Sequence, residues 1–227
     1  QETYTARYTM ETIALAFSIT EEAVEDNLYD KLATRYTRAL ARSMAQTRQI
    51  KGATVLNNAF STASPIGDGA ALCSAAHPSL SGDQSNLLAT PADLNETSLE
   101  DILIQIAGFT DERGLKIAVR GTKLLIPKEL QFIAERIINS NLRPGSADND
   151  VNAMKSMGML PEGAVVNHFF TDADAYFVKT DCPNGFKVFN RTPLTTGTEG
   201  DFDTGNLRFK ARERYAFGVS DWRCVFG

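Results

Sequence analysis

The stretch LLIPKELQFIAERIINSNLRPGSADNDVNAMKSMGM (residues 124–159) predicts a strand, a helix and a long polar loop, in that order. A strand is expected over Lys123–Ile126, and Pro127 suits the first position of the helix, where an N–H has no partner anyway. Apolar residues then recur at helical spacing, at Leu130, Ile133, Ala134, Ile137 and Ile138. The polar loop covers residues 141–160 and contains Met154, Met157 and Met159.

A long helix is predicted upstream of this block, over residues 25–51. Neither Gly nor Pro occurs between Leu28 and Lys51. Apolar side chains recur every four positions, at Leu28, Leu32, Tyr36, Leu40 and Met44. Acidic residues near the start and basic residues near the end match the helix macrodipole, and Gly52 is predicted to end the helix. Because the stripe is narrow, we expect packing along one side only, with Arg35, Arg38 and Arg42 at least partly exposed.

Shorter elements flank this helix. Residues 3–20 are rich in Thr, Tyr, Ile and Phe, which favours a hairpin arm or an edge strand, and Thr20 can cap a helix that follows. Residues 61–97 form a connector rich in Ser, Gly, Ala and Asn. The sequence Thr97-Ser98-Leu99-Glu100 predicts a capping box that opens a helix ending at Gly108. One face of that helix carries Leu99, Ile102, Leu103 and Ile106.

Strands complete the pattern. Lys116–Val119 and Lys123–Ile126 are predicted as strands around a turn at Arg120-Gly121. Short strands are also expected over residues 164–170, 175–180 and 186–190. Residues 207–217 alternate strictly, and one face of that strand carries Leu207, Phe209, Ala211, Glu213, Tyr215 and Phe217. The mixture of separate helices and strands predicts an α+β fold.

The amino-acid composition limits the classes of function that the chain can have. The 227 residues can bury a sizeable core, and the net charge of −5 argues against a dedicated polyanion binder. Three widely spaced cysteines argue against a disulfide framework and fit a reducing cytoplasm. No run of about 18 apolar residues exists, so no membrane span is expected. The sequence opens on Gln1 and not on Met, which indicates a processed or partial chain.

Two histidines raise the question of a metal or catalytic site. Cys73 and His77 have a spacing that could begin a zinc site, but a structural site needs four ligands and the others are far away in the sequence. His168 lies in an apolar stretch, which favours a buried, hydrogen-bonded histidine over a catalytic one. No metal, cofactor or catalytic residue is therefore predicted.

Two acidic segments resemble binding loops only weakly. Asp201-Phe202-Asp203, between Gly200 and Gly205, lacks the later glutamate of a calcium loop and is predicted as a turn that leads into the last strand. Gly67-Asp68-Gly69 is also predicted as a turn, because no Gly-Lys-Ser/Thr follows it. No nucleophile motif is present, so we expect no enzyme activity.

The sharpest charged feature is the second face of residues 207–217. That face carries Arg208, Lys210, Arg212 and Arg214. Either it is a solvated strand face, or it meets acidic groups of a neighbouring copy or packaged DNA. Glu199, Asp201 and Asp203 are the nearest acidic candidates in the same chain. The methionines of residues 154–159 are expected in the core or at an adaptable interface.

Three segments in this order resemble the major capsid proteins of tailed bacteriophages, in the group related to the Mu-type head subunit. The first is the strand, helix and loop of residues 124–159 quoted above. The second comprises GDGAALCSAAHPSLSG (67–82) and ADLNETSLEDIL (92–103), which are similar to the family's connector and second helix. The third comprises FFTDADAYFVKT (169–180), GFKVFNRTPL (185–194) and LRFKARERYAFGVSDWR (207–223), which are similar to its closing strands.

This resemblance implies the Hong Kong ninety-seven-type capsid fold, with a peripheral domain of a long spine helix plus a sheet and an axial domain of a sheet flanked by helices. Residues 1–24 correspond to the end of the extended loop and the strand that follows it, and residues 25–118 to the peripheral domain. Residues 119–195 correspond to the axial domain, and residues 196–227 to a strand that returns to the peripheral sheet. The N-terminal arm and most of the extended loop of the family have no counterpart here.

The resemblance also implies a function. We expect a structural major capsid protein that forms hexamers and pentamers of an icosahedral shell around double-stranded DNA, assembled in the host cytoplasm and located in the virion capsid. Expected partners are copies of itself, portal and scaffold or decoration proteins and, non-specifically, the packaged DNA. The alternative is an encapsulin-like cellular compartment of the same fold. A soluble enzyme or binding module is a more remote alternative.

Overall fold

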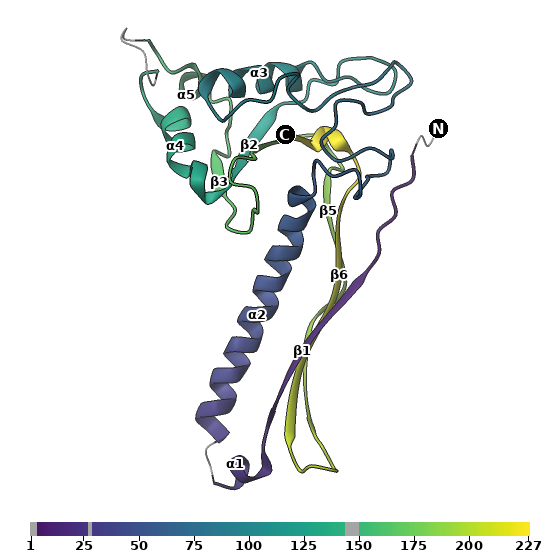
Figure 1. Cartoon of the computed structure of the whole chain (residues 1–227), viewed down its shortest axis with the longest axis vertical. Coiled ribbons are helices and arrows are strands. Elements are labelled where there is room, and N and C mark those ends of the chain that lie inside the picture. The colour runs from purple at the N-terminus through teal and green to yellow at the C-terminus, as the bar shows by residue number, and fades with distance from the viewer. Residues whose placement is uncertain (1–3, 27–28, 144–149) are drawn as a thin grey trace. The chain divides into compact units, whose positions relative to one another are not determined.

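The computed structural model describes residues 4–26, 29–143 and 150–227, without the side chains of residues 29–32 (Figure 1). The chain divides into two compact units. The long-helix unit comprises residues 8–52 and 188–218, and the four-stranded unit comprises residues 1–7, 53–187 and 219–227. Each unit contains both helices and strands, as an α+β fold requires.

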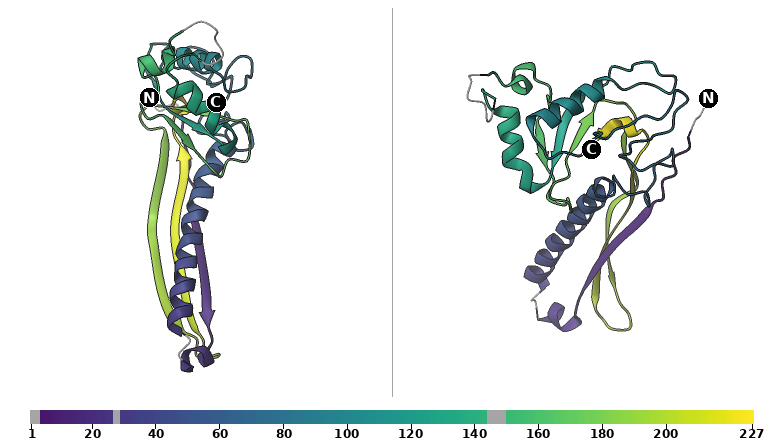
Figure 2. Two further views of the ribbon diagram at one scale, coloured as in Figure 1. Left: turned by 90° about the vertical axis from the view of Figure 1, so that its left-hand side faces the viewer. Right: turned by 45° about the horizontal axis from the view of Figure 1, so that its top comes forward.

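The long-helix unit is a three-stranded sheet with one helix along it, as Figure 2 shows from two sides. The strand order is β1–β6–β5, and β1 pairs antiparallel with β6, so that Phe17 lies opposite Phe209. Its elements are β1 (Glu11–Ile19), α1 (Glu21–Glu25), α2 (Tyr29–Asn57), β5 (Phe186–Gly200) and β6 (Leu207–Val219), of which α2 and the two long strands also extend into the other unit. The edge strand predicted in residues 3–20 is confirmed as β1, and Thr20 caps α1 by accepting a hydrogen bond from Ala23 N.

The apolar stripe of α2 is confirmed in part. Leu40 and Met44 are buried and pack with Ala211 of β6. Tyr36 is 46% exposed, because its ring lies at the edge of this cluster, 5.6 Å from that of Phe17. Leu28 and the side chain of Leu32 lie outside the described residues. Arg35, Arg38 and Arg42 are exposed, as predicted.

The expectation that Gly52 ends the helix is wrong. The helix runs on to Asn57, and its additional turn contributes the buried side chains of Ala53 and Leu56. A Cβ atom at Gly52 would lie 3.6 Å from the Phe217 ring, so the absence of a side chain allows β6 to approach the helix closely. The packing gained by continuing the helix outweighs the cost of about 1 kcal/mol for an internal glycine.

The four-stranded unit is built on a sheet of order β3–β2–β4–β7. Strand β2 is parallel to β3 and antiparallel to β4, and β4 is antiparallel to β7. The strands are β2 (Gly121–Ile126), β3 (Ala164–Val166), β4 (Phe177–Thr180) and β7 (Val225–Phe226). The helices are α3 (Glu96–Ala107), α4 (Gln131–Asn139) and α5 (Ala153–Met157), with the 3₁₀ turns η1 (Lys128–Leu130) and η2 (Trp222–Cys224).

The helical stripes of this unit are confirmed. Leu99, Ile102, Leu103 and Ile106 of α3 are all buried, and Gly108 caps the helix. In α4, Ala134 and Ile137 are buried, while Ile133 and Ile138 of the same helix and Leu130 of η1 pack partly buried against the same core. They share one core with Leu124 and Ile126 of β2, Val178 of β4 and Phe226 of β7.

Several predicted boundaries are wrong for identifiable reasons. The capping box of α3 is formed by Asn95 and Ser98, since the Asn95 side chain accepts from Ser98 N over 2.8 Å. Pro127 precedes the short turn η1 instead of opening α4 directly. The strand predicted at Lys116–Val119 is absent from the described residues, and Ala118 has a φ of 52°, which breaks extended backbone. Gly121 does not form a turn and is the first residue of β2.

The remaining strands differ in length. The strand predicted at residues 164–170 ends at Val166, and that predicted at 175–180 begins at Phe177. The strand predicted at residues 186–190 continues to Gly200, because it pairs with the equally long β6. The strand predicted at residues 207–217 is confirmed as β6.

Candidate functional site

Strand β6 presents an unusual basic face in the long-helix unit. Ala211 and Tyr215 are buried on one side, whereas Arg208, Lys210 and Arg212 are exposed on the other and Arg214 is half-buried. We call Arg208, Lys210, Arg212 and Arg214 the basic stripe. The alternation predicted from the sequence is therefore confirmed.

Small side chains border the basic stripe. On β1 the partners of these four cations in the register are Thr12, Ala14, Ala16 and Ser18. On the β5 side, a Cβ atom at Gly197 would lie 3.4 Å from Lys210 Cε, so the lysine stem lies over the glycine. Paired residues in a sheet point to the same face, so the basic stripe has no cross-strand carboxylate from β1.

Within the part of the chain that the structure describes, one end of the basic stripe is neutralised and the rest is not. Arg208 forms an ion pair with Asp201, which confirms the expected acidic partner at that position. Among the described residues, no ion pair reaches Lys210, Arg212 or Arg214, so neither Glu199 nor Asp203 serves them. The Nε atom of Arg214 is buried without a hydrogen-bond partner. The described residues therefore supply no counter-charge to these three cations.

The predicted turn at Asp201-Phe202-Asp203 is also confirmed. Asp201 N donates to Asn206 O over 2.9 Å, and Gly205, with a φ of 69°, donates its N–H to Asp201 O over 2.8 Å. The Asp201 carboxylate accepts from Thr204 Oγ1 over 2.6 Å as well as from Arg208. This carboxylate therefore organises the hairpin between β5 and β6.

The opposite face of β6 holds a buried charge that the sequence pattern did not reveal. Glu213 is 3% exposed, and its carboxylate lies 3.6 Å from the guanidinium of Arg48 on α2. Arg48 also donates to Asn190 Oδ1 over 2.7 Å and lies over the Tyr215 ring. Burial, and then the charge of Glu213, raise the pKa of Tyr215. These contacts join α2 to both long strands.

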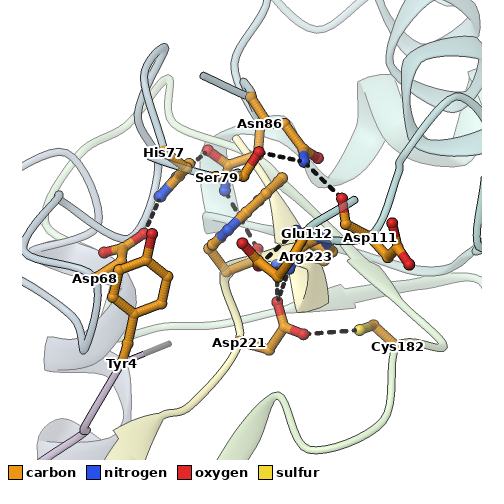
Figure 3. Close-up of polar contacts among 12 residues, drawn as sticks. Tyr4, Asp68, His77, Ser79, Asn86, Asp111, Glu112, Cys182, Asp221 and Arg223 are labelled. Carbon is orange, nitrogen blue, oxygen red and sulfur yellow. Dashed lines mark hydrogen bonds and ion pairs between the residues drawn. The ribbon is translucent and has the colours of Figure 1, made fainter. Parts of the chain in front are cut away.

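A second polar network lies in the four-stranded unit (Figure 3). His77 is fully buried between Asp68 and Asn86: its Nδ1 lies 2.7 Å from Asp68 Oδ2 and its Nε2 lies 3.0 Å from Asn86 Oδ1. Both ring nitrogens are therefore occupied by hydrogen bonds, which leaves neither to bind the zinc considered for Cys73 and His77. Burial raises the pKa of the Cys73 thiol well above its usual range.

The loop that supplies Asp68 is the predicted turn. Gly69, with a φ of 86°, donates its N–H to Ile66 O over 3.0 Å, and Asp68 Oδ1 accepts from Ala70 N over 3.0 Å. One carboxylate oxygen of Asp68 thus closes the turn while the other binds His77. The sequence predicted the turn, and the histidine contact, which spans nine residues, carried no local signal.

Trp222 connects this network to the C-terminal segment. The His77 ring stacks on Trp222 at 4.5 Å between centroids, and the Arg223 guanidinium lies 4.4 Å from the Trp222 ring. Arg223 is itself held by Glu112, at 3.1 Å, and by Asp221, at 3.4 Å. The Asp221 carboxylate also lies 3.6 Å from Cys182 Sγ, and burial followed by this charge raises the pKa of Cys182 to about 12. The network therefore stabilises the connector and the chain end together.

Two further predictions concern single residues. His168 is not buried: it is exposed in a turn after β3, because the strand ends at Val166 and Asn167 Oδ1 accepts from Phe169 N. In the polar loop, Met154 is buried in the core, Met157 is 69% exposed and Met159 packs partly buried. Part of that loop, residues 144–149, lies outside the described residues.

A sequence model of the family described as phage capsid protein matches residues 3–226. The chain belongs to the phage capsid protein family. This confirms the resemblance found in the sequence, and the chain is a structural major capsid protein. No curated protein matches the chain.

Solved structures agree with this family membership. The capsid of Myoviridae phage XM1 has a TM-score of 0.55 and 13% identity, with 96% of this chain and 72% of that chain covered. The capsid of the native GTA particle has a TM-score of 0.56 and 14% identity, with 96% and 72% covered. A virus-like particle from Pyrococcus furiosus has a TM-score of 0.54 and 10% identity, with 96% and 75% covered. These likenesses show the fold, which is the Hong Kong ninety-seven-type capsid fold.

For a capsid protein, surfaces matter more than a reactive centre. In the described part of the chain, no three His, Cys, Asp or Glu side chains gather as metal ligands do. No described helix combines the length and apolar character needed to cross a bilayer. On the basic stripe, three of the four cations have no ion-pair partner among the described residues.

Proposed function

We propose that this capsid protein assembles as hexamers and pentamers into an icosahedral phage head that encloses double-stranded DNA. The match of residues 3–226 to the phage capsid protein family is the observation that carries the proposal. A shell subunit acts by fitting copies of itself, and the uncompensated cations of the basic stripe suit such contacts. Its role is structural and not catalytic, and it acts in the virion capsid after assembly in the host cytoplasm.

We further propose that the long-helix unit forms the strut of the peripheral domain, with α2 as the spine helix. The axial domain assigned from the sequence to residues 119–195 contains β2, β3, β4, α4 and α5. Residues 53–118, which the sequence assigned to the peripheral domain, cluster with the four-stranded unit by contact. The domain boundaries remain a prediction, and limited proteolysis of assembled and unassembled subunits tests them.

The proposed partners beyond copies of this chain are a portal, scaffold or decoration proteins and packaged DNA. Contact with DNA is expected to be non-specific. Base reading requires side chains delivered into a groove by a helix or ribbon, and cations within a sheet face reach phosphates only.

Electron microscopy of the expressed chain tests the proposal directly. Capsomers or closed particles are the expected result, with duplex DNA inside particles isolated from infected cells. A chain that remains monomeric at every protein and salt concentration contradicts the shell proposal. Particles that carry a protein cargo and no phage DNA identify a cellular compartment instead.

A further inference from the structure

Most exposed acidic residues of the long-helix unit lie in α1 or in the turn between β5 and β6 and the residues beside them. Helix α1 and the turn between β5 and β6 adjoin each other, because a Cβ atom at Gly205 would meet the Glu21 carboxylate. Figure 1 shows α1 beside the end of this hairpin. We call the acidic end the set Glu21, Glu22, Glu25, Asp26, Glu199, Asp201 and Asp203. Within the described residues, only Asp201 of this set has an ion-pair partner, Arg208.

An aromatic side chain is exposed at the centre of the acidic end. Phe202 is 101% exposed, between Asp201 and Asp203 at the tip of the turn. Val24 of α1 is 41% exposed at the same end. A fully solvated phenylalanine on a turn packs against nothing in its own chain, so its ring is available for a contact with another molecule.

The basic stripe is complementary to this end in charge. Lys210, Arg212 and Arg214 have no ion-pair partner among the described residues, and the four small residues of β1 leave them open on one side. An aromatic ring can lie against guanidinium groups over such a floor and gain a cation–π contact. The acidic residues around Phe202 then face the cations.

The acidic end of a chain is too far from most of its own basic stripe. At roughly 3.3 Å per residue along a strand, Arg214 lies about 20 Å beyond Arg208, which the turn already neutralises through Asp201. The acidic end of the same chain therefore does not reach the far part of the stripe, whereas the acidic end of a second copy can.

We propose that the basic stripe of one copy receives the acidic end of a second copy, with Phe202 lying against the stripe. The inference deepens the proposed shell function and rests on it. Because the two surfaces differ, the contact is heterologous and propagates from copy to copy instead of closing as a two-fold dimer. A propagating contact is what a shell built from many subunits requires. Because the charges are exposed, salt screens the contact.

A charge-swap experiment on the full chain tests this pairing. The stripe variant carries Lys210→Glu and Arg212→Glu, and the end variant carries Glu25→Lys and Asp203→Lys. Each alone is expected to raise the protein concentration needed for assembly at least tenfold, measured by sedimentation and light scattering. One chain with all four changes is expected to assemble within about threefold of wild type, because its stripe is acidic and its end is basic in every copy, so that each contact is complementary again.

Two controls keep the result specific. Arg38→Glu with Arg42→Glu makes the same charge change on the exposed face of α2 and is expected to leave assembly within about threefold of wild type. Thermal unfolding followed by circular dichroism confirms that each variant is folded. If the stripe variant does not fold, a variant with Lys210→Gln and Arg212→Gln replaces it. The proposal is overturned if this neutral variant assembles with the same resistance to salt as the wild type. Phe202→Ala is expected to weaken assembly severalfold without a change in salt dependence.

The outcomes separate this inference from the shell function. A wild-type chain that never assembles overturns both. A wild-type chain that assembles, with a four-change chain that stays dissociated, overturns only the pairing of stripe and end. Stripe variants that assemble normally but no longer retain duplex DNA overturn it too, and assign the basic stripe to the nucleic acid.

Discussion

His77 Nε2 donates to Asn86 Oδ1 over 3.0 Å, and the remaining contacts of Asn86 set the direction of this bond. The Asn86 amide nitrogen lies within hydrogen-bond distance of three carbonyl oxygens, those of Leu72, Trp222 and Val225. Its oxygen also accepts from Ser74 N over 2.8 Å. The oxygen therefore faces the imidazole, so Nε2 carries a hydrogen while Nδ1 meets the Asp68 carboxylate.

The first prediction removes this asparagine. Asn86→Ala leaves buried carbonyls of the connector and the C-terminal segment without a donor, and each such group costs about 1–3 kcal/mol. We expect a loss of about 3–5 kcal/mol in the free energy of unfolding, measured by urea denaturation. Asn58→Ala is the matched control, because Asn58 is exposed, and it is expected to change stability by less than about 0.5 kcal/mol. Equal effects of the two substitutions contradict the role given to Asn86.

The second prediction concerns α2 as a spine that packs on its own sheet. Leu40→Asp buries a carboxylate against Met44 and Ala211, which is expected to cost several kcal/mol and to unfold the long-helix unit. Ala41→Asp, at an exposed neighbouring position, is expected to cost less than about 1 kcal/mol. Circular dichroism and urea denaturation of the unassembled chain measure both. A Leu40→Asp chain that is fully folded and fails only to associate shows instead that α2 is an interface helix.

The third prediction tests the close approach of β2 and α3. A Cβ atom at Gly121 would lie 2.6 Å from Leu103 Cδ2 and 3.0 Å from Val178 Cγ1. Gly121→Ala therefore overpacks a buried position and is expected to lower stability by about 1–3 kcal/mol. Gly200→Ala is the control, since a Cβ atom there meets nothing within 4 Å. If the melting temperatures of the two variants agree, the packing around Gly121 is looser than described.

Sequence periodicity correctly predicted the helices and strands whose apolar pattern repeats within one continuous segment of the chain. The stripes of α3 and the alternation of β6 repeat over several turns or residues, so their buried faces could be read directly. The errors at Gly52 and Gly121 have one cause. In a sequence, a glycine usually indicates the end of a helix or a turn. Here the missing side chain makes room for a neighbouring one, the Phe217 ring at Gly52 and the Leu103 side chain at Gly121. That neighbour is distant in sequence.

The two candidate surfaces also differ in whether the sequence could predict them. The basic stripe was visible because its residues alternate along one strand. The acidic end was not, because α1 and the turn after β5 lie far apart in the sequence and meet only in the fold. The Asn86 network likewise depends on contacts with residues more than 130 positions away, as its hydrogen bonds to Trp222 and Val225 show.

The fourth prediction concerns alkaline pH. Burial raises the pKa of Cys73, Cys182 and Cys224, so the folded state keeps these protons when the unfolded thiols lose theirs. Stability is then fully present below about pH 8.5, the ordinary thiol pKa, and falls as pH rises above it. Three such thiols give a slope of up to about 4.1 kcal/mol per pH unit. Urea denaturation between pH 8 and 10 measures this slope, which Cys73→Ala is expected to reduce by about a third. An unchanged slope in that variant shows that other groups cause the pH dependence.

The last prediction addresses the loop of residues 141–160, which we expect to contact the equivalent loop of neighbouring copies near the capsomer axis. Two of its three methionines differ sharply in environment: Met154 is 4% exposed and Met157 is 69% exposed. Met154→Asp buries a charge and is expected to unfold the four-stranded unit. Met157→Asp is expected to leave the monomer folded. It is expected to weaken assembly at least tenfold, because a solvated carboxylate replaces an apolar contact. Met157→Leu, which keeps the apolar surface, is the control and is expected to assemble as wild type does. Light scattering measures assembly, and circular dichroism measures folding. A folded Met157→Asp chain that assembles at the wild-type concentration places this side chain outside the contact, and a cryo-electron microscopy map with these loops apart in every copy contradicts the prediction as a whole.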